Sequence, residues 1–254
     1  MKKYACITGA SSGIGRELAR GLAKKGYSLI LVARRVDRLK QLSDELDVDC
    51  IVISKDLSRE EEVRDLVMKI SDLNVEVFVN NAGFGDAGEF VNGSLDKELN
   101  MIDVNIRALH ILTKEMLKIF QRKGRGYILN IGSSAGLFPA GPYMATYYAT
   151  KAYVVSFTEA IARELKEKNS HVSISVLCPG PVDTEFNRVA DVEFSLKGIS
   201  AADCASYALK EMFRGKVRIV PTLTMKLAVF GTRFISRNAT IRLTGRQQKK
   251  KIYK

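Results

Sequence analysis

The stretch Thr8-Gly9-Ala10-Ser11-Ser12-Gly13-Ile14-Gly15 decides the fold: an apolar run, Tyr4–Thr8, leads into it and Arg16-Glu17-Leu18-Ala19 follows. Glycines allow a tight turn, and the free amides at the start of the next helix can hold a pyrophosphate. The spacing Gly-x-x-x-Gly-x-Gly differs from the Gly-x-Gly-x-x-Gly fingerprint and lacks the ending of a nucleotide triphosphate loop. The stretch predicts either a plain strand-to-helix turn or a dinucleotide-binding turn. If the turn binds a dinucleotide, the residues expected to contact the cofactor are Gly9, Ser11, Ser12, Gly13, Ile14 and Gly15.

Short apolar runs alternate with segments of helical spacing along the chain. The expected strands are Tyr4–Thr8, Ser28–Ala33, Cys50–Ser54, Val75–Asn80, Tyr127–Ile131, Val172–Leu177 and Val217–Val220. The expected helices are Gly13–Lys25, Val36–Leu46, Arg59–Ile70, Leu95–Arg122, Tyr143–Lys168 and Ala201–Phe213. Because the strands lack polar alternation, we expect them to be buried on both faces and joined by right-handed crossovers. The pattern predicts a single α/β domain, a doubly wound Rossmann-type parallel sheet of about seven strands with helices on both faces.

Composition excludes several classes of protein. The chain has 254 residues, 46% hydrophobic and 27% charged, which is unlike disordered or fibrous proteins. We expect no signal peptide and no membrane-spanning segment, because no apolar run is long enough. The scattered cysteines form no Cys-x-x-Cys pair and predict neither a zinc site nor a disulfide framework. We therefore expect a cytoplasmic protein without a metal.

The positive charge is concentrated at the end of the chain. The net charge is +12, and the last acidic residue, Glu211, is followed by twelve lysines and arginines. We expect a catalytic domain over residues 1–222 and a basic amphipathic extension over 223–254, either part of the same domain or peripheral. Leu223, Leu227, Phe230 and Phe234 form one helical stripe there, near Lys226, Arg233 and Arg237. The stripe is expected to pack over the substrate cleft or a neighbouring subunit; weak contact with an anionic membrane is the alternative, and no nucleic acid is expected.

Two further positions concern the cofactor. The second strand ends Leu31-Val32-Ala33-Arg34-Arg35, with no acid before Asp37. An acid here would bind the ribose hydroxyl of NAD, whereas an arginine accommodates the 2′-phosphate of NADP. Arg34 and Arg35 therefore favour NADP(H) over NAD(H), unless they are only solvated side chains. Asp56 and Leu57 follow the third strand and are expected to bracket the adenine, with Asp56 alternatively capping the next helix.

Later motifs complete a pattern. They are Asn80-Asn81-Ala82-Gly83, Gly132-Ser133-Ser134-Ala135-Gly136, Tyr147-Tyr148-Ala149-Thr150-Lys151 and Pro179-Gly180-Pro181-Val182-Asp183-Thr184. Together with the glycine turn, they resemble the short-chain dehydrogenase/reductases from Tyr4 to about Thr184. The segment from Gly141 to Tyr153 further resembles a bacterial, DltE-like subgroup. The resemblance implies cofactor contacts at Asn81, Ala82, Gly83, Pro179, Gly180, Val182 and Thr184, and a homodimer or homotetramer.

The chemical centre follows from one spacing. Tyr147 and Lys151 are four residues apart, so on a helix they share a face, and a nearby ammonium would lower the pKa of the phenol. The resemblance implies that Tyr147 is the acid–base residue and that Lys151 also holds the nicotinamide ribose. It implies that a serine polarises the substrate carbonyl and that Asn105 supports a water-linked proton relay. Asn105 could otherwise be a polar residue that kinks a buried helix.

The choice of tyrosine and serine needs separate argument. Tyr148 has Ala152 four residues later, so it cannot form the pair with a lysine. Alignment through Gly132 selects Ser133, whereas the usual distance to the tyrosine in the family would favour Ser134. Ser133 is preferred because it stands at the strand end and the following loop can absorb an insertion.

Two other functions compete with the expected NADPH-dependent reduction of a carbonyl or oxidation of a secondary alcohol. Ser134 also lies in a Gly-x-Ser-x-Gly sequence typical of hydrolases, but His171 is poorly placed for that chemistry. A nucleotide sensor without catalysis is the second alternative. The expected substrate walls are Leu137–Met144 and Glu185–Ile199, where Phe138, Met144, Phe186 and Phe194 suggest an apolar molecule.

Overall fold

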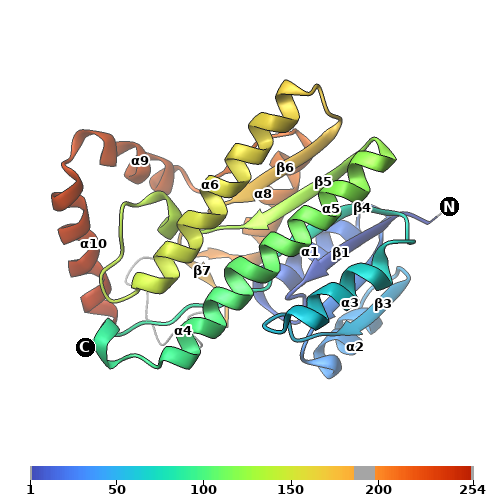
Figure 1. Cartoon of the computed structure of the whole chain (residues 1–254), viewed down its shortest axis with the longest axis horizontal. Helices are drawn as coiled ribbons and strands as arrows, with labels where there is room; N and C mark the ends of the chain where they lie inside the picture. Colours follow the sequence, from blue (N-terminus) through green and yellow to red (C-terminus); the bar gives the residue numbers. More distant parts are fainter. Residues whose placement is uncertain (1, 186–197, 253–254) are drawn as a thin grey trace.

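A computed structural model describes residues 2–185 and 198–252, with side chains described as far as Lys249. The main sheet consists of β1 (Tyr4–Thr8), β2 (Ser28–Ala33), β3 (Cys50–Ser54), β4 (Val75–Asn80), β5 (Gly126–Ile131), β6 (Val172–Leu177) and β9 (Arg218–Ile219). These seven strands are arranged in the order β3-β2-β1-β4-β5-β6-β9, and every pair is parallel (Figure 1). The predicted doubly wound parallel sheet is thereby confirmed.

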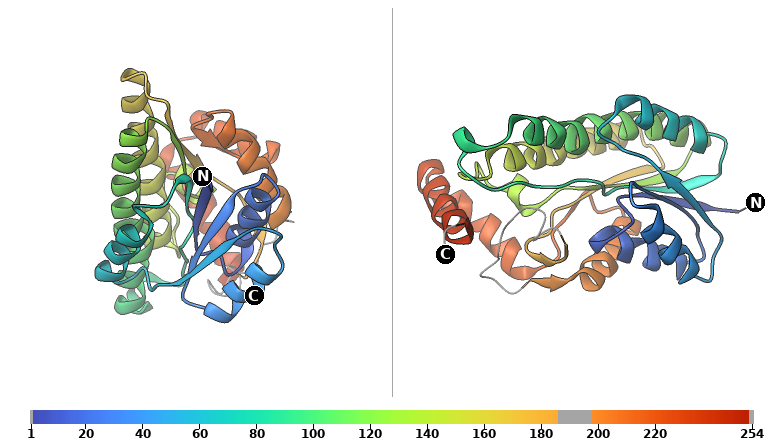
Figure 2. Two further views of the ribbon diagram at one scale, coloured as in Figure 1. Left: turned by 90° about the vertical axis from the view of Figure 1, so that its right-hand side faces the viewer. Right: turned by 90° about the horizontal axis from the view of Figure 1, so that it is seen from below.

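Helices cover both faces of the sheet (Figure 2). One face packs against α1 (Gly13–Ala23), α2 (Val36–Asp44) and α8 (Ala201–Phe213), whose apolar residues share a core with alternate strand residues. The other face packs against α3 (Glu60–Ile70), α5 (Leu109–Lys123) and α6 (Ala145–Glu167). The strands are thus sandwiched between two cores, which explains why their sequences lack polar alternation.

The strand order reverses next to β1. This strand pairs with β2 on one side and with β4 on the other, because the chain runs outward through β2 and β3 and then crosses back to form β4. A crevice opens beyond the carboxyl ends of the strands at such a point, and ligands of open α/β sheets bind there. The fold therefore directs attention to the residues that follow β1, β2, β4 and β5.

The expected long helix from Leu95 to Arg122 is divided. The structure has α4 (Leu95–Ile102), a π-helical segment η2 (Asp103–Ala108) and then α5. Asn105 lies within the π-helical turn, and turns of this kind are frequent at functional sites. The periodicity of apolar residues cannot reveal such a turn, because it changes the spacing only locally.

Several short elements were not expected from the sequence. They are η1 (Phe90–Asn92), η3 (Ser134–Leu137) and a separate two-stranded sheet of β7 (Val182–Asp183) and β8 (Ile199–Ser200). The last predicted strand, Val217–Val220, is reduced to the two residues of β9. The predicted substrate-wall residues Phe186 and Phe194 lie outside the described residues.

The C-terminal extension forms α9 (Leu223–Gly231), η4 (Thr232–Phe234) and α10 (Arg237–Ile252). These helices lie together at the end of the molecule opposite the N-terminus (Figures 1 and 2). Leu223, Leu227, Phe230 and Phe234 do not pack over the cleft, because all four side chains are exposed, and the alternative of packing against a neighbouring subunit stays a prediction. The opposite side of α9 faces inward instead. Within the described residues, no helix is both long and apolar enough to cross a membrane.

Candidate functional site

A cavity of about 500 Å³ lies beyond the carboxyl ends of the strands. Most of the residues singled out in the sequence line it, although they come from distant parts of the chain. They are Gly9, Ser11, Ser12, Gly13, Ile14, Arg34, Arg35, Asp56, Leu57, Asn81, Ala82, Gly83, Ser133, Tyr147, Lys151, Pro179, Gly180, Val182 and Thr184. Gly15 and Asn105 do not line the cavity, but each contacts residues that do.

The glycine turn is built for a close approach of backbone. Gly9 and Gly13 have φ angles of +66° and +54°. Residues that carry a Cβ atom rarely adopt such angles, whereas glycine does so readily. A Cβ at Gly15 would overlap the side-chain amide of Asn81 and the carbonyl oxygen of Gly9, so this glycine permits packing rather than ligand contact. The N-cap residue of α1, Ser12, makes no side-chain cap, which leaves the first amides of α1 available to an anion.

Asn81 holds this turn against β4. Its side-chain amide donates to the carbonyl oxygens of Thr8 and Gly9, both at 3.0 Å. The hydroxyl of Thr8 in turn accepts from the backbone amides of Asn81 and Ala82. This network fixes the two loops on either side of the strand reversal to one another. The role of Asn81 that the structure shows is therefore to order the turn.

Arginines line the cavity beyond the end of β2. The guanidinium of Arg35 donates to the hydroxyls of Ser11 and Ser12, each at 3.0 Å, and to the carboxylate of Glu185 at 3.1 Å. Arg38 bonds the same carboxylate at 2.7 Å. Hydrogen bonds from Arg38 and Arg35 lower the pKa of Glu185 to about 2. The cations at this end of the cavity are thus partly neutralised by one acid.

Asp56 does not cap α3. Its carboxylate accepts from the backbone amide and the hydroxyl of Ser58, at 3.1 and 2.8 Å, whereas the N-cap position of α3 is Arg59. Asp56 therefore orders the turn after β3. Both Asp56 and Leu57 line the cavity.

Ser133, Tyr147 and Lys151 meet at the centre of the cavity wall. Ser133 follows β5, while Tyr147 and Lys151 lie one turn apart on α6, and all three are buried. The side chain of Ser133 interacts with the hydroxyl of Tyr147 in the direction that lowers the pKa of the phenol. The ammonium of Lys151 donates to the carbonyl oxygen of Ile131 at 2.9 Å and lies 5.9 Å from the centre of the Tyr147 ring. This arrangement can polarise an oxygen in the cavity and exchange a proton with it.

The expected lowering of the tyrosine pKa is not found. Burial raises the pKa of Tyr147 to about 12, although the interaction with Ser133 acts in the opposite direction. Burial also lowers the pKa of Lys151 to about 8. Desolvation disfavours the charged form of both groups and is the largest cause of both pKa shifts. Sequence spacing could place the pair but could not show how deeply it is buried.

Asn105 lies outside the cavity lining and bonds residues of two segments that form the site. Its amide nitrogen donates to the carbonyl oxygen of Phe84 and to the hydroxyl of Thr150, and its oxygen accepts from the amide of Phe84. It is 1% exposed, and a Cβ at Gly83 would come within 2.8 Å of its oxygen. Asn105 therefore joins the loop after β4 to α6, close to Lys151.

The two serines differ in environment. Ser134 begins the short helix η3, and its backbone amide donates to the carbonyl oxygen of Pro179. No histidine is present among the described residues that line the cavity. His110 instead contacts Tyr153 at 2.6 Å. The hydrolase alternative, which requires a histidine beside Ser134, gains no support from this geometry.

The structure adds cavity residues that sequence reasoning missed. The C-terminal extension contributes Met225, Ala228, Gln247 and Gln248, and the loop after β4 contributes Phe84. Gln248 is buried and donates to the hydroxyl of Tyr148 at 2.5 Å. Its burial within an otherwise basic and polar helix gave no sequence signal. Within the described part of the chain, no group of three or more His, Cys, Asp or Glu residues is placed to bind a metal.

The sequence profile of the family described as short chain dehydrogenase matches residues 3–193 of this chain. The chain belongs to this family. It is 31% identical over 215 residues to an uncharacterised oxidoreductase of Staphylococcus epidermidis, across 83% of this chain and 92% of the relative. The short chain dehydrogenase fold and the site together make the chain an oxidoreductase.

Solved short chain dehydrogenases have the same fold. One from Sphingobium yanoikuyae, in complex with NADPH, has a TM-score of 0.81 and 29% identity, covering 92% of this chain and 94% of its own. Another from Burkholderia phymatum, in complex with NAD, has a TM-score of 0.82 and 25% identity, covering 96% and 95%. These complexes support a nicotinamide cofactor for this short chain dehydrogenase and leave its preference between NAD and NADP open.

Proposed function

We propose that this short chain dehydrogenase is an NADPH-dependent carbonyl reductase that also oxidises the corresponding secondary alcohol. The observation that carries the proposal is the placement of Ser133, Tyr147 and Lys151 together in the wall of the cavity, with Tyr147 and Lys151 one helical turn apart on α6. We also propose, from the resemblance of residues 141–153, that the chain is a member of the DltE-like bacterial subgroup.

The residues present fit a nicotinamide dinucleotide. The left-handed glycines and the free amides of α1 suit a pyrophosphate, because the backbone can approach it closely. Arg34 and Arg35 at the end of β2 suit a 2′-phosphate, which is why NADP(H) is preferred in this proposal. When bound, the reduced cofactor supplies the hydride that forms the new carbon–hydrogen bond.

The chain itself would provide the proton and the orientation. Ser133 would donate a hydrogen bond to the substrate carbonyl oxygen, and Tyr147 would transfer its hydroxyl proton to that oxygen as the carbon receives the hydride. A phenol with a pKa of about 12 is protonated at neutral pH, which suits the reductive direction. Lys151 would stabilise the resulting phenolate and hold the nicotinamide ribose. Asn105 would keep the loop after β4 in place for the proton relay.

The substrate part of the cavity is apolar. Phe84, Phe138 and Met144 line it close to Tyr147, and Met225 lines another part of the same cavity. Such a lining favours an apolar carbonyl compound, since each buried apolar group gains from leaving water.

The proposal includes a homo-oligomeric assembly and a cytoplasmic location. Phe90, Val91, Leu95 and Leu99 are exposed on η1 and α4, so we propose a homodimer or homotetramer formed in part by this surface. The described cysteines are free thiols, which suits a cytoplasmic enzyme.

Titration with NADPH and NADH, followed by oxidation against aldehydes, ketones and diketones, tests the proposal. Preferential NADPH binding with turnover is the expected result. Binding without turnover on the whole panel would favour the alternative, a non-catalytic nucleotide sensor. Absence of binding would contradict both.

A further inference from the structure

The short helix α9 has an unusual distribution of apolar side chains. Not one of its nine residues is buried, although the helix is largely apolar. Leu223, Leu227, Phe230 and the following Phe234 are spaced by four, three and four residues, which places them on one side. They are between 53% and 76% exposed. We call these four residues the apolar stripe.

The other side of α9 faces the proposed active site. Met225 and Ala228 line the cavity, and helical spacing places them opposite the apolar stripe. The stripe therefore is not the part of the helix that packs onto the enzyme. Apolar surface of this kind usually marks a contact with a partner or a membrane.

Cations flank the apolar stripe. The guanidinium of Arg233 lies 5.8 Å from the centre of the Phe230 ring, and the rings of Phe230 and Phe234 contact each other at 5.3 Å. Lys226 lies on the same flank as Arg233 by helical spacing, and its ammonium donates to the hydroxyl of Tyr207 at 3.0 Å. An aromatic and aliphatic stripe bordered by basic residues is the arrangement that binds the boundary between lipid headgroups and acyl chains.

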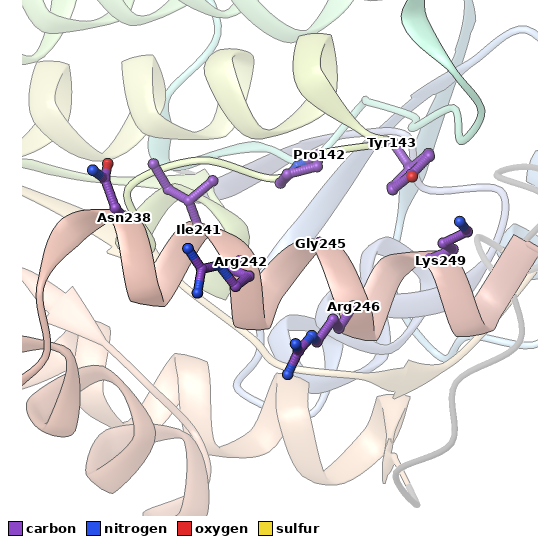
Figure 3. A pocket seen from close by; sticks show the side chains of 8 residues that line it. All are labelled: Pro142, Tyr143, Asn238, Ile241, Arg242, Gly245, Arg246 and Lys249. Atoms are coloured by element: carbon purple, nitrogen blue, oxygen red, sulfur yellow. The ribbon is translucent and has the colours of Figure 1, made fainter.

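The neighbouring helix α10 adds more positive charge. A shallow cavity of about 450 Å³ lies between this helix and Pro142 and Tyr143, and Arg242, Arg246 and Lys249 line it (Figure 3). No acidic residue follows Glu211 in the sequence, so nothing in the extension itself offsets these charges. α9 and α10 form one end of the molecule (Figure 1).

We infer that α9 and α10 bind peripherally to anionic phospholipid membranes. The apolar stripe enters the interfacial region, while Arg233 of η4 and the exposed arginines of α10, Arg242 and Arg246, contact the lipid phosphates. Charge complementarity selects this occupant, because a second copy would bring an equally basic end of the molecule against the first. If the proposed reductase function holds, α9 would link the membrane to the cavity, and the substrate would be an apolar carbonyl compound dissolved in the bilayer.

Co-sedimentation of the full chain with vesicles tests the inference. With vesicles of phosphatidylcholine and phosphatidylglycerol at low salt, the protein should pellet at least about tenfold more than with phosphatidylcholine alone. High salt should weaken this binding, because it screens the charges. Equal binding to both vesicle types, or none, would overturn the inference.

Two pairs of variants separate the apolar and the charged contributions. Leu227→Gln with Phe230→Gln should reduce binding about tenfold, while Met68→Gln, at a similarly exposed position on α3, should not. Arg233→Glu with Arg246→Glu should reduce it by a similar factor. Lys24→Glu with Lys166→Glu changes the net charge equally at other exposed sites and should have a smaller effect. Similar losses in the test and control variants would overturn the proposed surface.

Sedimentation velocity and NADPH titration complete the design. If the stripe variant lowers the mass of an oligomer and the wild type binds no vesicles, the stripe is a subunit interface and the inference is wrong. Unaltered thermal unfolding of the variants shows that they are folded, as expected for exposed positions. Vesicle binding requires no catalysis, so failure of the reductase proposal in the NADPH assay is recognised independently.

Discussion

The side chains of Ser133 and Tyr147 meet in the wall of the cavity and interact there, although fourteen positions and the helix η3 separate them in the chain. The interaction with Ser133 lowers the pKa of Tyr147, but burial raises it more, so that the phenol is protonated at neutral pH. The parallel sheet makes this contact possible by bringing the end of β5 beside the first turns of α6.

Removal of the phenolic hydroxyl tests the assigned proton donor. Tyr147→Phe should lower turnover by about 100- to 10,000-fold, because it deletes the donor and little volume. NADPH affinity, measured by fluorescence, should change little. Tyr153→Phe is the matched control, since its hydroxyl contacts His110 away from the cavity. Turnover of Tyr147→Phe close to that of the wild type would refute the assignment.

Reversal of charge after β2 tests the cofactor preference. Arg34→Asp should weaken NADPH binding on the order of 10- to 100-fold and should leave NADH binding unchanged or improved. The reason is that a carboxylate repels the 2′-phosphate and can accept a bond from a ribose hydroxyl. Lys40→Asp makes a similar charge change at an exposed position of α2 and is the control. An unaltered ratio of the two affinities in Arg34→Asp would show that Arg34 is only a surface charge.

Glu185 is expected to compete with the cofactor phosphate for its arginines. Its carboxylate bonds both Arg35 and Arg38, and its pKa of about 2 keeps it ionised at neutral pH. Glu185→Gln should therefore tighten NADPH binding by about two- to tenfold while affecting NADH less. Calorimetric titration with both cofactors measures this difference. A loss of NADPH affinity would instead mean that Glu185 positions Arg35 productively.

Lys151 should make stability depend on pH. Its pKa is lowered from 10.5 to about 8, so between these values the unfolded chain binds more protons than the folded one. By linkage, the contribution of Lys151 to the free energy of unfolding rises with pH across this interval, by up to on the order of 3 kcal/mol. Above a pH of about 10, the raised pKa of Tyr147 acts in the opposite direction, so the useful range ends there.

Urea unfolding between pH values of about 8 and 10 measures this contribution. Relative to Lys151→Met, the wild type should gain stability as the pH rises, since the variant has no buried ammonium to desolvate. Lys166→Met removes an exposed lysine and should show no such trend relative to the wild type. Parallel stability curves for Lys151→Met and the wild type would contradict the burial of a charged group.

The sequence alone determined the strands of the sheet and most of the residues at their carboxyl ends. Apolar runs and glycine turns are local signals, so five of the predicted strands, from Tyr4–Thr8 to Val172–Leu177, have the bounds that the structure shows. Residues that follow such strands must gather at one edge, because all parallel strands point the same way. For that reason the sequence alone predicts that Gly9, Arg35, Asn81 and Ser133 lie at one cavity.

Only the tertiary structure decided how these residues interact. The bond of Arg35 to Glu185 spans 150 positions, and that of Gln248 to Tyr148 spans 100, and neither has a local sequence signal. The depth of burial likewise set the pKa of Tyr147 above its ordinary value, against the expectation from its spacing to Lys151. The side of α9 that faces the cavity was settled in the same way, by packing against the body of the protein. Periodicity identifies an apolar face, but the surface that covers it depends on contacts made far along the chain.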